Sequence, residues 1–205
     1  YLQQTVLPQM PVAELKEAIK WEVEKYIPQA IDNYYFDFAA LDTTSNPLQV
    51  KGLIVAARRQ AVDNLVALIK GAGLRPVAVE IEPVVWQRTC KEVKNALVVD
   101  IGGRITQITL LQGGCPVVSR AIDLGGYTFT QVIASVLDLP YAEAERLKQR
   151  QPGLLPDIVR PVELSPLHRA LLQTVEELTR EIQRTVSFYQ EQHAGMQIDQ
   201  LLLAG

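Results

Sequence analysis

Apolar positions in the first 75 residues follow helical and strand periods in turn. Residues 12–26 space their apolar side chains by three and four, which predicts a helix with one buried stripe that begins after Pro11. The runs 1–8, 33–41 and 49–57 are rich in β-branched or aromatic residues, so they predict strands. A second helical stripe precedes the glycine-rich stop "GAG". The predicted order is strand, helix, strand, strand, helix.

Strand patterns dominate the middle of the chain. Residues 75–83 predict a strand and residues 84–93 a helix. Three strands then follow in succession, with turns at "GGR" and "QGGC", over 96–101, 106–111 and 116–122. A meander of this kind is typical of one edge of a mixed sheet.

Helical periods return in the last third. A helix is predicted after "LGG", a short helix from Pro140 over 140–150, and the longest helix over 171–189. The proline-rich stretch 152–166 predicts an irregular loop, and 198–205 predicts a buried strand. Helices and strands alternate along the whole chain, which indicates an α/β fold.

The composition is that of a folded globular protein. Of 205 residues, 48 % are apolar and 21 % are charged, which excludes a disordered tail as the main content. The net charge of −3 is spread along the chain and gives no electrostatic footprint for nucleic acid, so we expect no nucleic-acid partner. Cys90 and Cys115 have neither disulfide-framework nor metal-ligand spacing.

Direct membrane insertion is not expected. No apolar run reaches the roughly 18 residues that cross a bilayer, and no charged segment followed by an apolar one marks secretion. Any membrane association should therefore come through a partner. The chain opens on Tyr1 without a methionine and stops at Gly205 directly after an apolar run, so we expect a fragment of a longer protein.

The stretch "VVDIGGRITQITLL" carries candidate chemistry. A strand ending in Asp100 is followed by Gly102 and Gly103, which let the backbone approach an anion because glycine has no Cβ. Successive N–H groups in such a turn can form an anion nest. Asp100 would repel a bare phosphate, so its role would be to hold Mg²⁺, through water. The same residues also fit an ordinary hairpin turn.

The order of motifs resembles a known family. "EIEP", a helix, "VVDIGGRITQITLL", "DLGG" with a helix, and a distant "LLLAG" resemble the second half of the actin-like ATPases. "LKEAIKWEVEKYIP", "YYFDFAAL" and "VAARRQAVDNLVALIKGAGLRPVAVEIEP" resemble the type IV pilus assembly (PilM) family within them, of which FtsA is a relative. "DLGGYTFTQVIASVLDLPYAEAERLKQ" resembles that family's Gly-Gly helix and the turn behind it. The likeness runs along nearly the whole chain.

The resemblance implies a fragment of an actin-like, ribonuclease H-like ATPase fold. A small α/β subdomain of the partner-binding type would occupy residues 1–75, and a connecting strand and helix would occupy 76–95. The second nucleotide-fold lobe would cover 96–205 and carry a helical insert at about 139–165.

The resemblance also implies a set of site residues for ATP and Mg²⁺. Asp100, Gly102, Gly103 and Thr106 would form the second phosphate loop, with Asp100 at the metal. Glu82 would lie near the attacking water as the catalytic acid or base. Gly125 and Gly126 would begin a helix facing the cleft, and Ala204 and Gly205 would start the adenosine turn.

The phosphate loop departs from the family pattern at two positions. Relatives carry small or hydroxyl residues where this chain has Arg104 and Ile105, although an arginine can itself contact phosphate. The family's first phosphate loop is absent from the sequence and the adenosine turn is cut short. We therefore expect at most a slow Mg-dependent ATPase in the complete protein, and no nucleotide bound to this fragment alone.

The resemblance implies a cytoplasmic scaffold of type IV pilus assembly, also called competence machinery. It would lie at the inner face of the cytoplasmic membrane and bind the N-terminal cytoplasmic tail of a PilN-like protein that spans that membrane once. The alternatives are a nucleotide-free GspL-like secretion scaffold, favoured by Arg104 and Ile105, an FtsA-like cell-division filament protein, and a sugar or acetate kinase. The sequence leaves the oligomeric state open.

Overall fold

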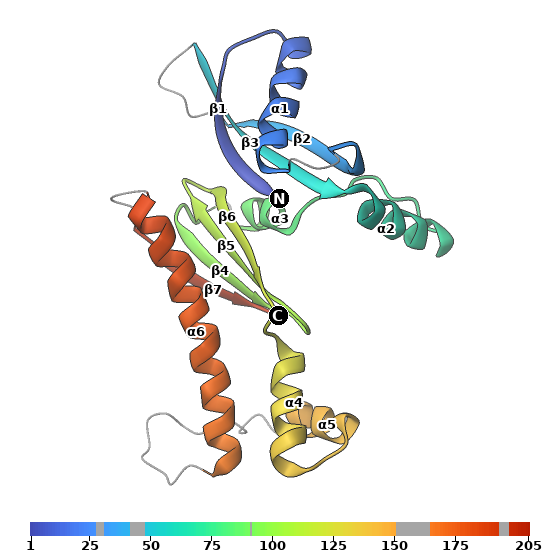
Figure 1. Cartoon of the computed structure of the whole chain (residues 1–205), viewed down its shortest axis with the longest axis vertical. Coiled ribbons are helices and arrows are strands. Elements are labelled where there is room, and N and C mark those ends of the chain that lie inside the picture. The colour runs from blue at the N-terminus through green and yellow to red at the C-terminus, as the bar shows by residue number, and fades with distance from the viewer. Residues whose placement is uncertain (28–30, 42–47, 91, 151–164, 193–196) are drawn as a thin grey trace. The chain divides into compact units, whose positions relative to one another are not determined.

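Two units make up the chain, each with its own sheet. The computed structural model describes residues 1–27, 31–41, 48–90, 92–150, 165–192 and 197–205 (Figure 1). The first unit comprises Tyr1–Lys91 with Cys115–Ser119, and the second comprises Glu92–Gly114 with Arg120–Gly205.

The first unit is built on a three-stranded antiparallel sheet. In sequence its elements are β1 (Leu2–Pro8), α1 (Val12–Tyr26), a short 3₁₀ helix (Ile31–Asn33), β2 (Tyr34–Leu41), β3 (Gln49–Arg58), α2 (Arg59–Gly71) and α3 (Glu82–Thr89). The strand order is β1-β3-β2, so β3 is central and β2 is an edge strand. The predicted order of these elements up to α2 is confirmed.

Helix α1 covers one face of this sheet. Ile19 and Val23, from its predicted stripe, pack with Leu7 of β1 and with Ile54 and Ala56 of β3 in a buried cluster. The side chains of β3 alternate between the two faces, so Leu53, Val55 and Ala57 lie on the face opposite α1. That second face belongs to the groove described below.

The strand predicted over 75–83 is wrong. Residues 74–81 have no regular secondary structure, and Glu82 and Pro83 already belong to the first turn of α3. Val77 is 93 % exposed and Val79 is 47 % exposed, so the apolar alternation that indicated a strand is not buried in a sheet. Pro83 fits the start of a helix because backbone N–H groups in the first turn have no partner within the helix, so a proline there loses no hydrogen bond.

The second unit contains a four-stranded mixed sheet. The strands of this sheet are β4 (Ala96–Ile101), β5 (Thr106–Gln112), β6 (Cys115–Ile122) and β7 (Gln200–Ala204), in the order β6-β5-β4-β7, and Cys115–Ser119 of β6 are the residues that the division assigns to the first unit. β4 pairs antiparallel with β5 and parallel with β7. The four apolar residues 96–99 are all buried, as are Ile108, Leu110 and Leu111 of β5. The predicted meander in a mixed sheet is confirmed.

Three helices complete the second unit: α4 (Gly126–Leu137), α5 (Tyr141–Arg150) and α6 (Pro166–Gln192). They meet in a buried cluster of Ile133, Ala144 and Leu171. Further along α6, Arg120 of β6 bonds Thr185 at 2.9 Å and Glu181 at 2.7 Å, which ties the helix to the sheet. Helix α5 lies within the range 139–165 that was predicted to be a helical insert, and most of the proline-rich loop predicted over 152–166 lies outside the described residues.

Candidate functional site

Most of the predicted site residues meet at one end of the second sheet. The parallel strands β4 and β7 place Asp100 directly beside Ala204 in register. Gly205 follows with φ +127°, and a Cβ on it would lie 2.2 Å from the carbonyl oxygen of Ile101. Glycine at 205 is therefore required by its close approach to β4. Asp100 is half-buried and has no ion-pair partner among the described residues.

The loop between β4 and β5 is a short hairpin turn, residues 102–105. The N–H of Gly102 donates to the carbonyl of Ile105 at 3.0 Å, which closes the turn. The N–H groups of Gly103, Arg104 and Ile105 donate no hydrogen bond to any described residue. A Cβ on Gly103 would meet nothing within 4 Å, and Arg104 is exposed at the tip. The turn thus presents three unused donors and an arginine.

The start of α4 holds this turn through backbone hydrogen bonds. Gly126 N–H donates to Gly102 O at 3.0 Å, and Tyr127 N–H donates to Gly103 O at 2.6 Å. A Cβ on Gly125 would lie only 2.5 Å from Gly102 O. The two predicted glycine motifs therefore pack directly against each other, and the first N–H groups of α4 are used by the protein itself.

Thr106 directly follows the turn as the first residue of β5, and its side chain points into the protein. Its side chain is fully buried, and its hydroxyl donates to the carbonyl of Leu124 at 2.6 Å. This bond ties β5 to the segment that leads into Gly125. The described geometry makes Thr106 a support for the two loops and does not expose its hydroxyl at the surface of the turn.

Lys148 is a neighbour of the site that the sequence reasoning missed. Its Nζ lies 2.9 Å from Gly126 O, 2.7 Å from Thr130 Oγ1 and 2.8 Å from a carboxylate oxygen of Glu145. Hydrogen bonds from Lys148 and then from Thr130 lower the pKa of Glu145 from its ordinary 4.5 to about 2. The Glu-x-x-Lys spacing on one face of a helix was the available signal.

Glu82 belongs to the first unit, whereas these loops belong to the second. It is exposed in the first turn of α3, and its carboxylate accepts a hydrogen bond from Trp86 Nε1 at 3.0 Å. Across the described ranges, no group of three or more His, Cys, Asp or Glu side chains is arranged to hold a metal ion. Within those ranges, Asp100 therefore does not belong to such a group.

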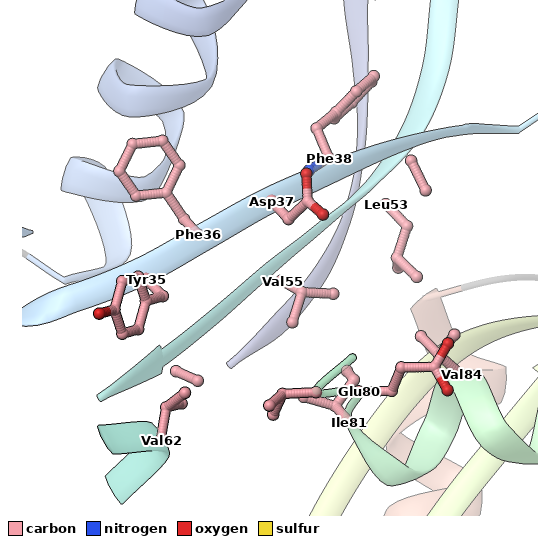
Figure 2. A pocket seen from close by; sticks show the side chains of 13 residues that line it. Tyr35, Phe36, Asp37, Phe38, Leu53, Val55, Val62, Glu80, Ile81 and Val84 are labelled. Atoms are coloured by element: carbon pink, nitrogen blue, oxygen red, sulfur yellow. The ribbon is translucent and has the colours of Figure 1, made fainter. Parts of the chain in front are cut away.

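The first unit carries a groove of about 470 Å³ on the face of its sheet opposite α1. Consecutive residues 35–39 of β2 line it, together with residues of β3, α2 and the 79–84 segment (Figure 2). Figure 2 shows Phe36 and Phe38 on one side of β2 and Val55, Val62 and Ile81 on the other. The apolar residues across the groove are Leu53, Val55, Val62, Val79, Ile81 and Val84.

Polar contacts hold one end of the groove. Tyr35 donates its hydroxyl proton to Asp63 at 3.1 Å, and the guanidinium of Arg59 lies 4.2 Å from the centre of the Tyr35 ring. Arg59 Nε also donates to the carbonyl of Asp32 at 2.7 Å. These contacts fix the start of α2 against β2. The family resemblance predicted that part of a partner-binding surface lies in residues 1–75, but the contribution of 79–84 could not be seen in the sequence.

Comparisons with known proteins agree with this architecture. The family profile described as "Type IV pilus assembly protein PilM" matches residues 5–205. A solved PilM-PilN type IV pilus biogenesis complex contains a chain 31 % identical to this one, with a TM-score of 0.78; the match covers 100 % of this chain and 59 % of that chain. The chain thus spans about three-fifths of that relative.

Two more distant proteins extend the comparison. The cell division protein FtsA of Bacillus subtilis (strain 168) is 30 % identical over 107 residues, which are 50 % of this chain and 24 % of FtsA. MreB5 of Spiroplasma citri, solved with AMPPNP bound, superposes with a TM-score of 0.50 at 21 % identity, covering 64 % of this chain and 48 % of MreB5.

These matches confirm the expected actin-like α/β fold. Within the described residues, no helix is long and apolar enough to cross a membrane. The family profile extends over nearly the whole sequence and the solved relative over all of it. This chain belongs to the type IV pilus assembly protein PilM family.

Proposed function

We propose that the full-length protein is a cytoplasmic, ATP-binding scaffold of type IV pilus assembly. It binds the N-terminal cytoplasmic tail of a PilN-like inner-membrane protein and is thereby held at the inner face of the membrane. Family membership and the 31 % identity to a chain of the PilM-PilN complex support the partner. The observation that carries the proposal is the groove on the first unit, because it is apolar, elongated along a strand and large enough for several side chains.

The groove suits an extended peptide. β2 is an edge strand of the sheet, so among the described residues its outer side has no strand partner, and an added strand would pair there. Peptides bound in this way gain affinity from backbone hydrogen bonds and specificity from side-chain pockets. Leu53 lines the groove and is only 2 % exposed, so this part of the lining is apolar and well packed.

A pair of valines in the irregular segment provides a matched test. Val79 lines the groove and Val77 does not, and both are exposed, so glutamine at either position should leave the fold intact. Val79→Gln in the full-length protein should weaken binding of a PilN-tail peptide by about tenfold, since burying a valine contributes about 1.5 kcal/mol. Val77→Gln should bind like the wild type. Equal affinities in a fluorescence-anisotropy titration would place the binding surface elsewhere.

The nucleotide part of the proposal rests on the turn 102–105. A side chain at position 103 would meet no neighbouring atom, and the backbone there does not have a positive φ, so the fold itself does not require Gly103. A phosphate that approaches the backbone closely would require it, because a Cβ would be in its way. The unused N–H groups of Gly103, Arg104 and Ile105 are donors of the kind that bind phosphate oxygens. With ATP bound, Asp100 would hold Mg²⁺ through water and Arg104 would contact phosphate. The Gly125–Gly126 turn would border the nucleotide.

Further roles follow from the same proposal. Ala204 and Gly205 would begin the adenosine-binding turn, and Thr106 would support the phosphate loop from inside. Glu82 would orient the attacking water, so hydrolysis would be a slow, Mg-dependent step. The MreB5 structure contains a bound nucleotide analogue, but its 21 % identity supports the shared fold and not the ligand.

Two substitutions test the turn in the full-length protein. Arg104→Ala should weaken ATP binding about tenfold, because a charge-assisted bond contributes roughly 1.5–3 kcal/mol. Asp100→Ala should weaken Mg·ATP more than metal-free ATP, because its role is to hold the cation. Calorimetry that finds both variants unchanged, with the fold intact by circular dichroism, would favour the nucleotide-free scaffold instead. An FtsA-like role is less well supported, because that match covers only 24 % of FtsA.

A further inference from the structure

Two acidic residues line the apolar groove of the first unit, and they differ in how they are paired. Glu80 is neutralised by Arg88, whose guanidinium contacts both carboxylate oxygens, with Nη1 at 2.6 Å from Oε1. Asp37 is exposed and has no cationic partner among the described residues. Its Oδ1 accepts the N–H of the neighbouring Phe38 at 2.8 Å. Among the described residues that line the groove, none is a lysine or an arginine.

The position of Asp37 aims it at a bound peptide. It lies at the middle of β2, directly opposite Val55 of β3 in register. Residues on both faces of β2 line the groove, so the groove reaches past the face of the sheet to the free edge of the strand. A segment that added to this edge would lie about 5 Å from β2, within reach of the Asp37 carboxylate.

We propose that Asp37 is a specificity residue that pairs with one lysine or arginine side chain of the peptide docked along β2. The inference rests on the proposed binding of the PilN-like tail and specifies its chemistry: an extended segment with apolar side chains toward Val55 and Val62, and a basic side chain at the position facing Asp37. The apolar lining alone does little to fix the position of the peptide along β2, because apolar side chains of the peptide fit it in similar ways. One charge pair in the partly dehydrated groove fixes which residue of the peptide stands opposite Asp37.

The test uses the full-length protein and a synthetic peptide that copies the N-terminal cytoplasmic segment of PilN from the same organism. The peptide amine is acetylated, so that only side chains supply positive charge. Asp37→Asn should weaken binding about tenfold and should flatten its dependence on salt. Glu17→Gln on the exposed face of α1 removes the same charge from the same unit and should change the affinity by less than twofold.

A charge exchange makes the pairing specific. Peptides in which each basic residue in turn is replaced by glutamate should bind the wild type poorly, and one of them should regain at least tenfold in affinity with Asp37→Lys. Equal binding of wild type and Asp37→Asn, or no peptide rescued by Asp37→Lys, would overturn this inference while the groove stands as the docking site. A wild-type protein that does not bind the peptide at all would overturn the proposed function together with it.

Discussion

The glycines around the β4–β5 turn differ in whether the packing of the protein requires a residue without a side chain. Gly125 and Gly205 are required by the protein, since a Cβ on either would lie within 2.5 Å of a backbone oxygen. Gly103 has open space around it. The sequence motif alone could not separate these cases, because the reason lies in a contact between residues more than twenty positions apart.

Alanine at these glycines should separate packing from ligand approach. Gly125→Ala should lower the free energy of unfolding by about 1–3 kcal/mol, because the added methyl group overlaps the Gly102 carbonyl. Gly103→Ala should change stability by about 0.5 kcal/mol or less, yet weaken ATP binding in the full-length protein. Urea denaturation and calorimetry on the two variants measure both effects. A Gly125→Ala variant as stable as the wild type would contradict the close packing of the two turns.

Glu145 should make stability depend on pH through its pairing with Lys148. Its folded pKa of about 2 lies below the ordinary 4.5, so the folded protein binds this proton more weakly than the unfolded chain does. The resulting stabilisation is complete above pH 4.5 and is lost as the pH falls toward 2. Wild type should therefore exceed Glu145→Gln in stability near neutral pH, and the difference should shrink through that window.

Lys148→Met serves as the control for that pH dependence. Without the ammonium group the main cause of the lowered Glu145 pKa is gone, so the acid-dependent part of the stability should be reduced in this variant as well. Chemical denaturation of the three proteins over a pH series provides the comparison. A difference between wild type and Glu145→Gln that stays constant with pH would show that the pair does not hold the carboxylate ionised.

At the scale of elements, periodicity predicted α1, β3 and β4 correctly and the segment 75–83 wrongly. The stripe of α1 and the runs of β3 and β4 are buried, so their patterns gave the right structure. The alternation in 75–83 resembled theirs but is not paired in a sheet, since Val77 is 93 % exposed. Local pattern cannot tell a strand that pairs from an extended segment that does not, because pairing depends on distant residues.

The pairing of β2 with β3 depends on one small residue. A Cβ on Gly52 would lie about 2 Å from ring atoms of Phe38, so the ring occupies the space that a side chain at 52 would need. Gly52→Ala should cost about 1–3 kcal/mol in the wild type. In a Phe38→Leu background the same substitution should cost much less. A double-mutant cycle by urea denaturation measures this coupling, and additive effects would contradict the ring's position.

For the molecule as a whole, the sequence predicted which loops come together better than it predicted which residues form the groove. Asp100, the Gly102–Gly103 turn, the Gly125–Gly126 turn and Ala204–Gly205 were grouped by family resemblance, and all lie at one end of the β4–β7 pair. The groove could not be assembled in the same way. It combines strands β2 and β3, helix α2 and the segment from Val79 to Val84 that runs into α3, and no spacing rule in the sequence links these elements.

The two candidate sites lie on different units of one chain, which makes a dependence of one on the other measurable. If the scaffold responds to nucleotide, Mg·ATP should change the affinity for the PilN-tail peptide by about fivefold or more, corresponding to the usual 1 kcal/mol or more of allosteric coupling. The peptide must then change the affinity for Mg·ATP by the same factor, because coupling between two binding equilibria is reciprocal.

Asp100→Ala should abolish the effect of Mg·ATP on peptide binding and leave nucleotide-free peptide affinity intact. Val79→Gln should weaken peptide binding but leave the affinity for Mg·ATP unchanged when no peptide is present. Titrations of each ligand with and without the other decide the matter, and a peptide affinity that is the same with and without saturating Mg·ATP would mean that the scaffold does not respond to nucleotide.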